Sequence, residues 1–285
     1  MAQYTNQAQL SYNGTVVNSN IAVGEIVGTL TATKTAIRDT YSRGDSIAYV
    51  VSIVNTGSAV SGLSVTDNLG EYTFGEGTLF PLTYTEGSTV YFVNGVLQPT
   101  PTVTYDGNEL IITGISVPAN GNAIIVYETV ANSFAPLNEG GEITNTITIN
   151  GIGVSPITAE ETISAVAGPL LTITKSISPV PVEENGRVTY NFLIQNLGNA
   201  DAVATDNIVL TDVFNPILTD IVVSYNGTPW TEGVEYTYNE ATGVFTTTQS
   251  AITVPSAIYT QDPTTGEWQS TPGAVNLTVT GTIRS

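Results

Sequence analysis

The fold class is decided by the stretch Ile47-Ala48-Tyr49-Val50-Val51-Ser52-Ile53-Val54, which is followed by Asn55-Thr56-Gly57. The run is rich in β-branched residues, which favour strands, and the Asn and Gly after it favour a tight turn. Comparable short runs separated by turn residues recur along the chain, whereas the periodicity of an amphipathic helix is almost absent. This pattern predicts an all-β protein made of antiparallel sandwiches, with roughly seven strands in each domain.

The same stretch returns later in the chain, so the sequence contains an internal repeat. Four pairs of residues match at a constant offset of 141 positions: Lys34 with Lys175, Tyr49 with Tyr190, Asn55 with Asn196, and Gly57 with Gly198. After a short insertion, Thr66-Asp67 matches Thr211-Asp212. The repeat predicts two immunoglobulin-like β-sandwich domains in tandem, over residues 30–151 and 170–285, joined by a linker over residues 152–169.

The two copies of the repeat end differently. The first copy closes with a strand over Ile143–Gly151. The second copy stops after Val275–Ile283, which aligns with Ala123–Val130 of the first copy and leaves no counterpart of the closing strand. Domain 2 is therefore predicted to lack its last strand.

A segment that resembles the missing strand stands near the start of the chain, around Asn6. Asn6 precedes Lys34 by 28 residues, much as Asn145 precedes Lys175 by 30 residues. We therefore expect residues 1–29 to form an N-terminal donor strand and a linker into domain 1.

A sandwich that lacks a strand exposes an apolar groove and unpaired backbone groups along two strand edges. The donor strand would fill such a groove with its alternate residues, which are Tyr4, Asn6, Ala8, Leu10 and Tyr12. If the groove belongs to the next subunit, the contact is head to tail and does not close, so the expected partner is the chain itself in a filament. Two alternatives stay open: the strand fills a groove of its own chain, or residues 1–29 are a flexible leader on a monomer.

Charge and composition exclude several classes of function. The chain has 25 acidic and 6 basic residues and a net charge of −19, so neither nucleic acid nor an anionic membrane surface is an expected partner. It has no Cys and no His, which excludes thiol chemistry, a His general base and zinc sites built from these residues. The paired carboxylates Glu160-Glu161 and Glu183-Glu184 are predicted to be solvated charges in turns or linkers. We expect no enzyme, no metal and no cofactor.

The chain has only two lysines, and both occupy the same position of the repeat. An amine that points into a sandwich core is costly unless it is paired or has reacted. Lys, Asn and a buried acid are the groups needed for a self-formed isopeptide bond, because desolvation makes the amine nucleophilic and the acid assists the loss of ammonia. Two such sites are predicted: Lys34, Asn145 and Asp67 within one chain, and Lys175 and Asp212 with Asn6 of the neighbouring subunit.

The alternative reading of these residues is purely structural. A lysine can extend along a strand edge into solvent, an asparagine can bond the backbone of a turn, and an aspartate can cap a loop. Both readings are open at the level of the sequence, with Asp67 and Asp212 as candidate assisting acids in the first.

The motifs of copy one resemble a bacterial surface repeat family called domain of unknown function 11. The matching elements are Gly44-Asp45, Tyr49, Asn55-Thr56-Gly57, Thr66-Asp67, Val117-Pro118 and Thr144-Asn145-Thr146. Copy two departs from the pattern at Asn185-Gly186 and in lacking the closing strand. The opening Thr5-Asn6-Gln7-Ala8 is similar to a leaderless clostridial group whose layout resembles spore-appendage fibre proteins. The resemblance implies an immunoglobulin-like sandwich and a structural role on a surface.

A binding module is the competing interpretation. Trp230, Trp268 and Tyr236 are candidates for an aromatic platform that would bind a glycan in a monomeric adhesin, although such residues more often fill a core. The opening residues have no basic segment followed by an apolar one, so no classical signal peptide is expected in this chain. We expect an extracellular location on a spore or cell surface, with a surface protein as a further candidate partner that anchors the fibre.

Overall fold

A computed structural model describes residues 2–26 and 29–284. The described residues form strands and one short 3-10 helix, η1 (Ala204–Asp206), and they divide into two compact units. Unit 1 comprises the chain up to Ala135 together with Ile143–Ile163, and unit 2 comprises Pro136–Glu142 and Ser164–Ser285. The expected all-β sandwich class is confirmed.

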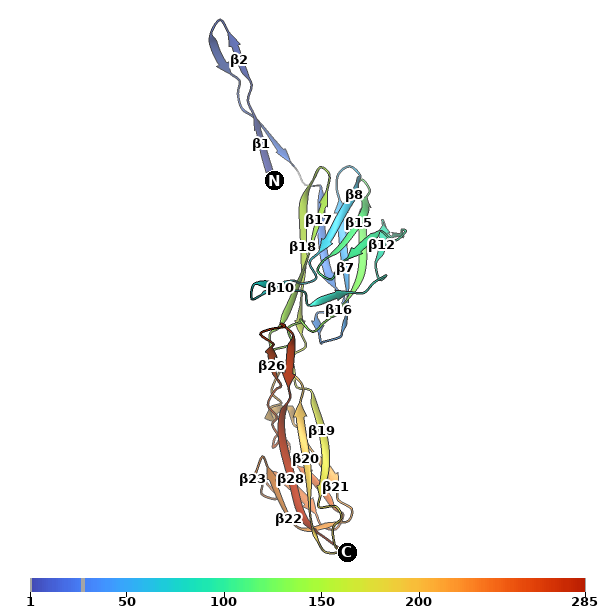
Figure 1. Ribbon diagram of the computed structural model, residues 1–285, viewed down its shortest axis with the longest axis vertical. Coiled ribbons are helices and arrows are strands. Elements are labelled where there is room, and N and C mark those ends of the chain that lie inside the picture. The colour runs from blue at the N-terminus through green and yellow to red at the C-terminus, as the bar shows by residue number, and fades with distance from the viewer. Residues whose placement is uncertain (1, 27–28, 285) are drawn as a thin grey trace. The chain divides into compact units, whose positions relative to one another are not determined.

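Unit 1 consists of two facing sheets (Figure 1). The first has the order β13-β12-β16-β7-β5, with β11 also paired to β16; the bounds are β5 Leu30–Ala36, β7 Ser46–Asn55, β11 Leu82–Tyr84, β12 Val90–Val93, β13 Val96–Leu97 and β16 Asn122–Ala131. The second has the order β14-β15-β8-β17-β18-β6; the bounds are β6 Thr40–Tyr41, β8 Val60–Asp67, β14 Thr102–Tyr105, β15 Leu110–Val117, β17 Glu142–Gly151 and β18 Val154–Ala165. A small hairpin is formed by β9 (Tyr72–Phe74) and β10 (Gly77–Leu79).

The core of unit 1 follows from the alternation seen in the sequence. In β7 the inward residues Tyr49, Val51 and Ile53 are fully buried, while those between them are partly exposed. Ile147 and Ile149 of β17 are buried from the opposite sheet. Strand β17 is thus a central part of the sandwich, and its loss would open the core.

The structure differs from the predicted linker over residues 152–169. Residues 154–165 form β18, which pairs with β17 and β6, so the closing element of unit 1 is a hairpin of two strands. Glu160 and Glu161 lie within this strand and not in a turn or linker. The prediction failed because β18 alternates polar and small residues with few apolar ones, a pattern that resembles a linker.

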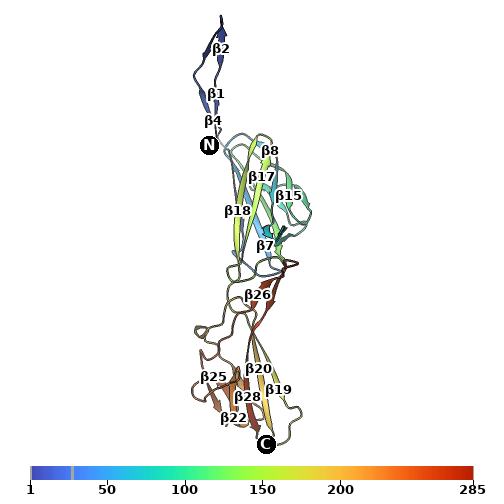
Figure 2. The same ribbon diagram turned by 60° about the vertical axis from the view of Figure 1, so that its left-hand side comes forward.

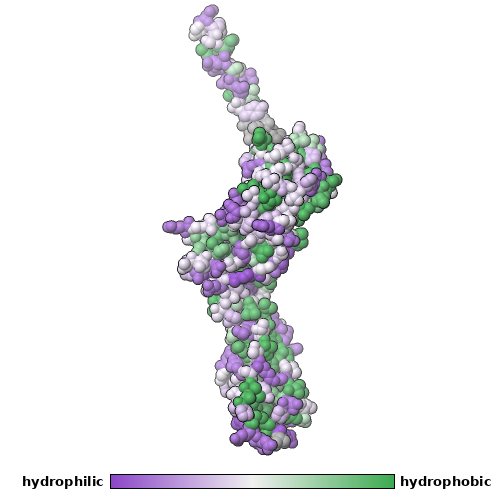
Figure 3. All heavy atoms as spheres, turned by 45° about the vertical axis from the view of Figure 1, so that its right-hand side comes forward, coloured by the Kyte–Doolittle hydropathy of each residue, from purple (hydrophilic) through white to green (hydrophobic). Residues whose placement is uncertain are grey.

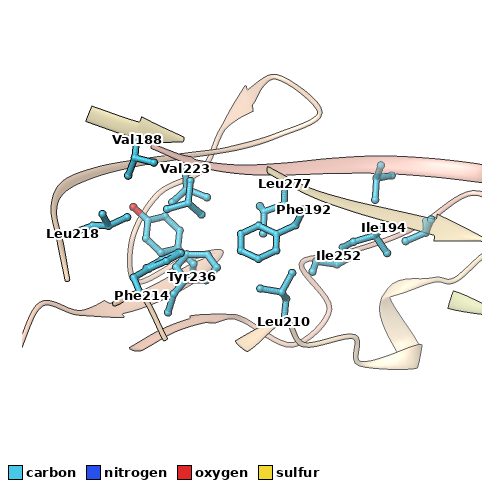
Figure 4. Packing of buried hydrophobic residues seen from close by; sticks show 14 of the residues in the cluster. Val188, Phe192, Ile194, Leu210, Phe214, Leu218, Val223, Tyr236, Ile252 and Leu277 are labelled. Atoms are coloured by element: carbon cyan, nitrogen blue, oxygen red, sulfur yellow. The ribbon is translucent and has the colours of Figure 1, made fainter. Parts of the chain in front are cut away.

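Unit 2 contains a five-stranded sheet, β19-β20-β28-β22-β23, and a three-stranded sheet, β21-β25-β24. The bounds are β19 Leu171–Ser178, β20 Arg187–Asn196, β21 Thr211–Val213, β22 Leu218–Tyr225, β23 Thr228–Pro229, β24 Tyr236–Asn239, β25 Val244–Thr247 and β28 Gly273–Ile283. A hairpin of β26 (Ile258–Gln261) and β27 (Trp268–Thr271) precedes β28. Figure 4 shows the core, in which Phe192 and Leu277 face Leu210 and Ile252.

The repeat is visible in the matching strands of the two units. In each unit the Asn of the Asn-x-Gly turn is buried, and its Oδ1 accepts a hydrogen bond from the Gly amide at 2.9 Å, for Asn55 with Gly57 and Asn196 with Gly198. The second sheets differ. Strand β8 pairs with β15 on one edge and β17 on the other, whereas β21 pairs only with β25 among the described residues.

The N-terminal segment is a hairpin and not a single strand with a linker. Strand β1 (Ala2–Asn6) pairs with β4 (Ala22–Ile26), and β2 (Gln9–Tyr12) pairs with β3 (Thr15–Asn18). The turn is Asn13-Gly14, with both φ angles positive as a tight two-residue hairpin turn requires. Within residues 2–26 and 29–284, these four strands form ladders only with one another.

Among the described residues, no helix is long and apolar enough to cross a membrane.

Candidate functional site

The first site lies in the core of unit 1 and is centred on Lys34. Its position in β5 points inward, so the side chain is completely buried, as is that of Asp67 on the facing sheet. Lys34 Nζ donates a hydrogen bond to Asp67 Oδ2 at 2.7 Å and lies 4.6 Å from the centre of the Tyr49 ring. The amine is thus held by one carboxylate and one aromatic face inside an apolar sandwich.

The carboxyl group of Asp67 accepts hydrogen bonds from several other groups near this amine. The same Oδ2 also accepts a hydrogen bond from the Tyr127 hydroxyl, and the Asn145 amide nitrogen donates to it at 3.4 Å. The second oxygen, Oδ1, accepts from the backbone N–H of Leu69 at 2.8 Å. The structure therefore brings together Lys34, Asp67 and Asn145, the three residues that the sequence assigned to one site.

Asn145 is fully buried, and its carbonyl oxygen has no hydrogen-bond partner. An unpaired buried carbonyl costs about 1–3 kcal/mol, so this arrangement is expensive for a residue with only a structural role. The Tyr49 hydroxyl is likewise buried with no hydrogen bond of standard geometry. Burial raises the pKa of Tyr49, and hydrogen bonding by the neighbouring Asn145 side chain opposes this rise, so the two groups lie close together. A phenol and a carboxamide oxygen thus stand unpaired beside the amine.

Burial dominates the protonation of this cluster. Desolvation lowers the pKa of Lys34 from 10.5 to about 8, and the neighbouring Asp67 only partly opposes the shift. Burial also raises the pKa of Tyr49 and of Tyr127, with a further contribution from the negative charge of Asp67, so both phenols stay protonated and can donate hydrogen bonds. A lysine with this pKa has an accessible neutral form, which is the nucleophilic one.

The three side chains are those that an amide exchange with loss of ammonia would require. In such a reaction the ammonium of Lys34 would pass a proton to Asp67, and the neutral amine would add to the side-chain carbonyl carbon of Asn145. Asp67 would then deliver one proton to the carboxamide nitrogen, which would leave as ammonia, and would take one from the attacking nitrogen. The products would be an amide between Lys34 and Asn145, one ammonia, and protonated Asp67.

The second site, in unit 2, repeats part of this geometry. Lys175 of β19 forms an ion pair with Asp212 of β21, and its amine lies 4.6 Å from the centre of the Tyr190 ring. The side chains of Lys175 and Asp212 are 40% and 19% exposed, whereas those of Lys34 and Asp67 are 0% and 1% exposed. The second pair is therefore open to solvent where the first is closed.

Among its described residues, unit 2 contains no counterpart of Asn145 or of the strand that carries it. Every residue of β19 after the first is exposed, including the apolar Ile173 (57%) and Ile177 (44%). In unit 1 the matching strand β5 is alternately buried. On the face of the molecule drawn in Figure 3, hydrophobic residues (green) lie among hydrophilic ones (purple). The exposed face of β19 and the edge of β21 that pairs with no described strand are where a closing strand would lie, and we refer to this region as the acceptor groove.

The described chain does not join Asn6 to this second site. Asn6 lies in β1 opposite Ala22 and is exposed, as are Tyr4, Leu10 and Tyr12. The reaction of Asn6 with Lys175 of a neighbouring subunit therefore stays a prediction.

Sequence reasoning missed three residues of the first site. Tyr127 was not singled out, although it stands directly opposite Tyr49 in the β16–β7 ladder and its ring stacks on that of Tyr49 at 5.9 Å. Tyr49 was used only to align the repeat. Glu161, assigned to a linker, raises the pKa of Lys34 through its charge. The alternating pattern of the strands Asn122–Ala131 and Ser46–Asn55 could have indicated the tyrosine pair.

Two of the three aromatic residues considered for a glycan platform belong to the core of unit 2. Tyr236 is buried in that core (Figure 4), and its ring packs against that of Phe245. Trp230 stacks on Tyr225 with ring centres 5.0 Å apart and packs against the same core. These two rings fill space inside unit 2.

Comparison with known proteins gives only distant structural likeness. No family model matches the chain, and no curated protein matches it. Among solved structures, BcpA, the major pilin subunit of Bacillus cereus, is similar at 14% identity and a TM-score of 0.38, over 96% of this chain and 73% of that one. A C-terminal fragment of the major pilin GBS80 of Streptococcus agalactiae is similar at 13% identity and a TM-score of 0.36, over 86% and 91%.

The pilus backbone protein RrgB of Streptococcus pneumoniae is similar at 13% identity and a TM-score of 0.34, over 85% of this chain. The chain spans about half, 55%, of the length of that structure. All three TM-scores lie below 0.5, so the function has to come from the geometry of the two units themselves.

Proposed function

We propose that this protein is the structural subunit of a fibre, which grows head to tail as the N-terminal segment of one chain enters the acceptor groove of the next. The observation that carries the proposal is the second site. It has the lysine, the acid and the aromatic ring of the first site, but none of its described strands corresponds to the one that closes the first. A segment that matches this strand stands elsewhere in the same chain, exposed.

The match between donor and groove can be followed residue by residue. An offset of 139 positions places Asn6 on Asn145, and it places Ala8 and Leu10 on Ile147 and Ile149. Both isoleucines are fully buried in unit 1, whereas Leu10 is 65% exposed in the hairpin. Burying an exposed leucine contributes about 1.5–3 kcal/mol, and the backbone of β21 gains a hydrogen-bonded partner.

The order of elements along the chain favours donation to another subunit. In unit 1 the closing hairpin β17–β18 directly precedes β19, the first strand of unit 2. The N-terminal hairpin in the same way directly precedes β5, the first strand of unit 1. By this order it would close a unit that comes before unit 1, and unit 2 of another chain fits because its described strands include no such hairpin beside β21.

We further propose that isopeptide bonds lock the fibre: Lys34 with Asn145 within a subunit, and Lys175 with Asn6 between subunits. Asp67 and Asp212 act as the assisting acids. In unit 1 the Tyr49 hydroxyl is the donor that stabilises the oxyanion as the amine adds, which accounts for two unpaired groups in one buried site. Such bonds would provide durability in a chain that has no cysteine.

The proposed location is extracellular, on a spore or cell surface, with an anchoring surface protein as a further partner. Membership of the surface repeat family called domain of unknown function 11, and of its leaderless clostridial group, belongs to the same proposal. The proposed role as a fibre subunit does not depend on membership of that family or of that group.

Negative-stain electron microscopy of the purified chain tests the proposal. The full chain should form filaments, and the chain without residues 1–14 should remain monomeric with unit 1 still folded. A full chain that stays at monomer mass at high concentration, unchanged by the deletion, would overturn it.

A further inference from the structure

The N-terminal hairpin and the closing hairpin of unit 1 have the same register. In unit 1 the Thr144 and Thr162 hydroxyls are hydrogen bonded at 2.8 Å, and the Ala165 N–H donates to the Gly141 carbonyl at 2.7 Å. Both contacts fit a ladder in which Thr144 stands opposite Thr162. Subtracting the offset of 139 gives Thr5 and Val23, which are paired in the N-terminal hairpin. The turns agree as well: Gly14 and Gly153, related by the same offset, both have a φ of 75°.

Both strands of the closing hairpin belong to the unit 1 sheet. Strand β17 lies between β8 and β18, and β18 continues the sheet to β6 (Figure 2). Ile163 of β18 is fully buried, and Glu161 is close enough to raise the pKa of Lys34. The second strand thus contributes both to the core and to the surroundings of the reactive amine.

The second strand of the N-terminal hairpin is built to match. The offset places Tyr4 and Gly24 at the positions of Ile143 and Ile163, which are both buried. A Cβ atom added to Gly24 would lie 2.3 Å from the Tyr4 ring, so that ring covers the glycine. Tyr4 has a large ring and Gly24 has no side chain, so the pair takes the place of the two isoleucines. The shape of the inward face is thereby conserved.

We infer that the element transferred between subunits is the whole hairpin β1–β4, docked in the register of β17–β18, and not its first strand alone. This inference rests on the proposed fibre function. It specifies that unit 2 of one chain binds both strands of the N-terminal hairpin of a second copy. The register of β17 on β8, with Ile147 opposite Asp67, then places Ala8 opposite Asp212. Strand β4 lies against the donor strand, with Ala22 at the position that Glu161 occupies near Lys34.

Substitutions in β4 distinguish docking of the whole hairpin from docking of its first strand alone, because adjacent residues of β4 face opposite sides of the hairpin. Ala22 lies opposite Asn6 on the inward face, whereas Val23 is 61% exposed on the other face. In a docked hairpin, Ala22→Arg brings a bulky cation next to Lys175 and should reduce the polymerisation rate at least tenfold. Val23→Arg adds the same charge on the outward face and should polymerise at the wild-type rate. Ala22→Glu reproduces the residue of unit 1 and should also polymerise normally.

Polymerisation is followed by light scattering of the full-length variants, each first shown to be folded by circular dichroism. The inference is overturned if the wild type polymerises and Ala22→Arg does so as fast as Val23→Arg, because residues 22–26 then act only as a linker. Hydrogen exchange gives a second readout: the amides of residues 15–26 should gain protection in the polymer, and their staying unprotected would also overturn it. A wild type that does not polymerise contradicts the proposed function itself.

Discussion

Replacing Asn145 with alanine should remove the covalent bond of unit 1 and lower its stability strongly. A Lys34–Asn145 bond closes a loop of 112 residues. By the chain-entropy relation used for disulfides, closing a loop of this size reduces the entropy of the unfolded chain enough to stabilise the fold by about 5 kcal/mol. For a domain of this size, that free energy corresponds to a melting temperature lower by about 10–20 °C.

The contacts of the Asn145 side chain account for little of this change. Its carbonyl oxygen is unpaired, and its amide makes one long hydrogen bond of 3.4 Å to the Asp67 carboxylate, worth at most about 3 kcal/mol. A loss well above that value therefore reports the covalent bond. Asn6→Ala is the matched control, because it removes the corresponding asparagine of the N-terminal hairpin and leaves the sandwich core of unit 1 intact.

Calorimetry and intact mass together provide the assay. Loss of ammonia makes the bonded wild-type chain about 17 Da lighter than its sequence, and Asn145→Ala should have its full sequence mass. The calorimetric transition of unit 1 should move down in Asn145→Ala and stay unchanged in Asn6→Ala. A monomeric wild type at its full sequence mass, with the same transition as Asn145→Ala, would refute the reasoning.

The remaining predictions concern pH, the phenol and the second lysine. In Asn145→Ala, Lys34 stays an amine with a folded pKa of about 8 against 10.5 unfolded, so the unfolded chain binds more protons between pH 8 and 10. The free energy of unfolding of unit 1 should then rise by about 2 kcal/mol over this range in denaturant titrations, and a flat profile contradicts the assigned burial. Tyr49→Phe removes a hydroxyl without a partner, so the fold should keep its stability while the loss of ammonia, followed by mass spectrometry, slows about 100-fold or more. An unchanged rate would exclude this phenol as oxyanion donor. Lys175→Met should still give filaments, but boiling in detergent should reduce them to monomers; resistant multimers would show that Lys175 is not the linking residue.

The sequence predicts the fold class because the alternation in strands such as Ile47–Val54 is strong and survives in the structure. It also indicates that Lys34, Asp67 and Asn145 belong together, since the repeat fixes equivalent positions and strand alternation turns them inward. Strand β18 escapes prediction because few of its residues are buried, so its sequence shows little apolar alternation. The hairpin form of residues 2–26 escapes prediction because the side chains of β2 and β3 are exposed and no core imposes a pattern on them.

Other parts of the site depend on long-range pairing that a single sequence does not specify. Tyr127 reaches Asp67 only because β16 pairs with β7 in one particular register. Its counterpart in unit 2 is Val279, which stands opposite Tyr190. Unit 2 therefore has one phenol where unit 1 has two, a difference that the repeat alignment alone did not reveal.

The most direct test of the fibre is to identify which chains are joined. Chains labelled with ¹⁵N and unlabelled chains are mixed as monomers and polymerised, and the detergent-resistant multimers are digested and analysed by tandem mass spectrometry. The account predicts a peptide in which Asn6 is linked to Lys175, with labelled–unlabelled hybrids present in the statistical proportion. Linked peptides found only within one label would show that each chain fills its own groove. Filaments without the linkage would contradict the covalent lock.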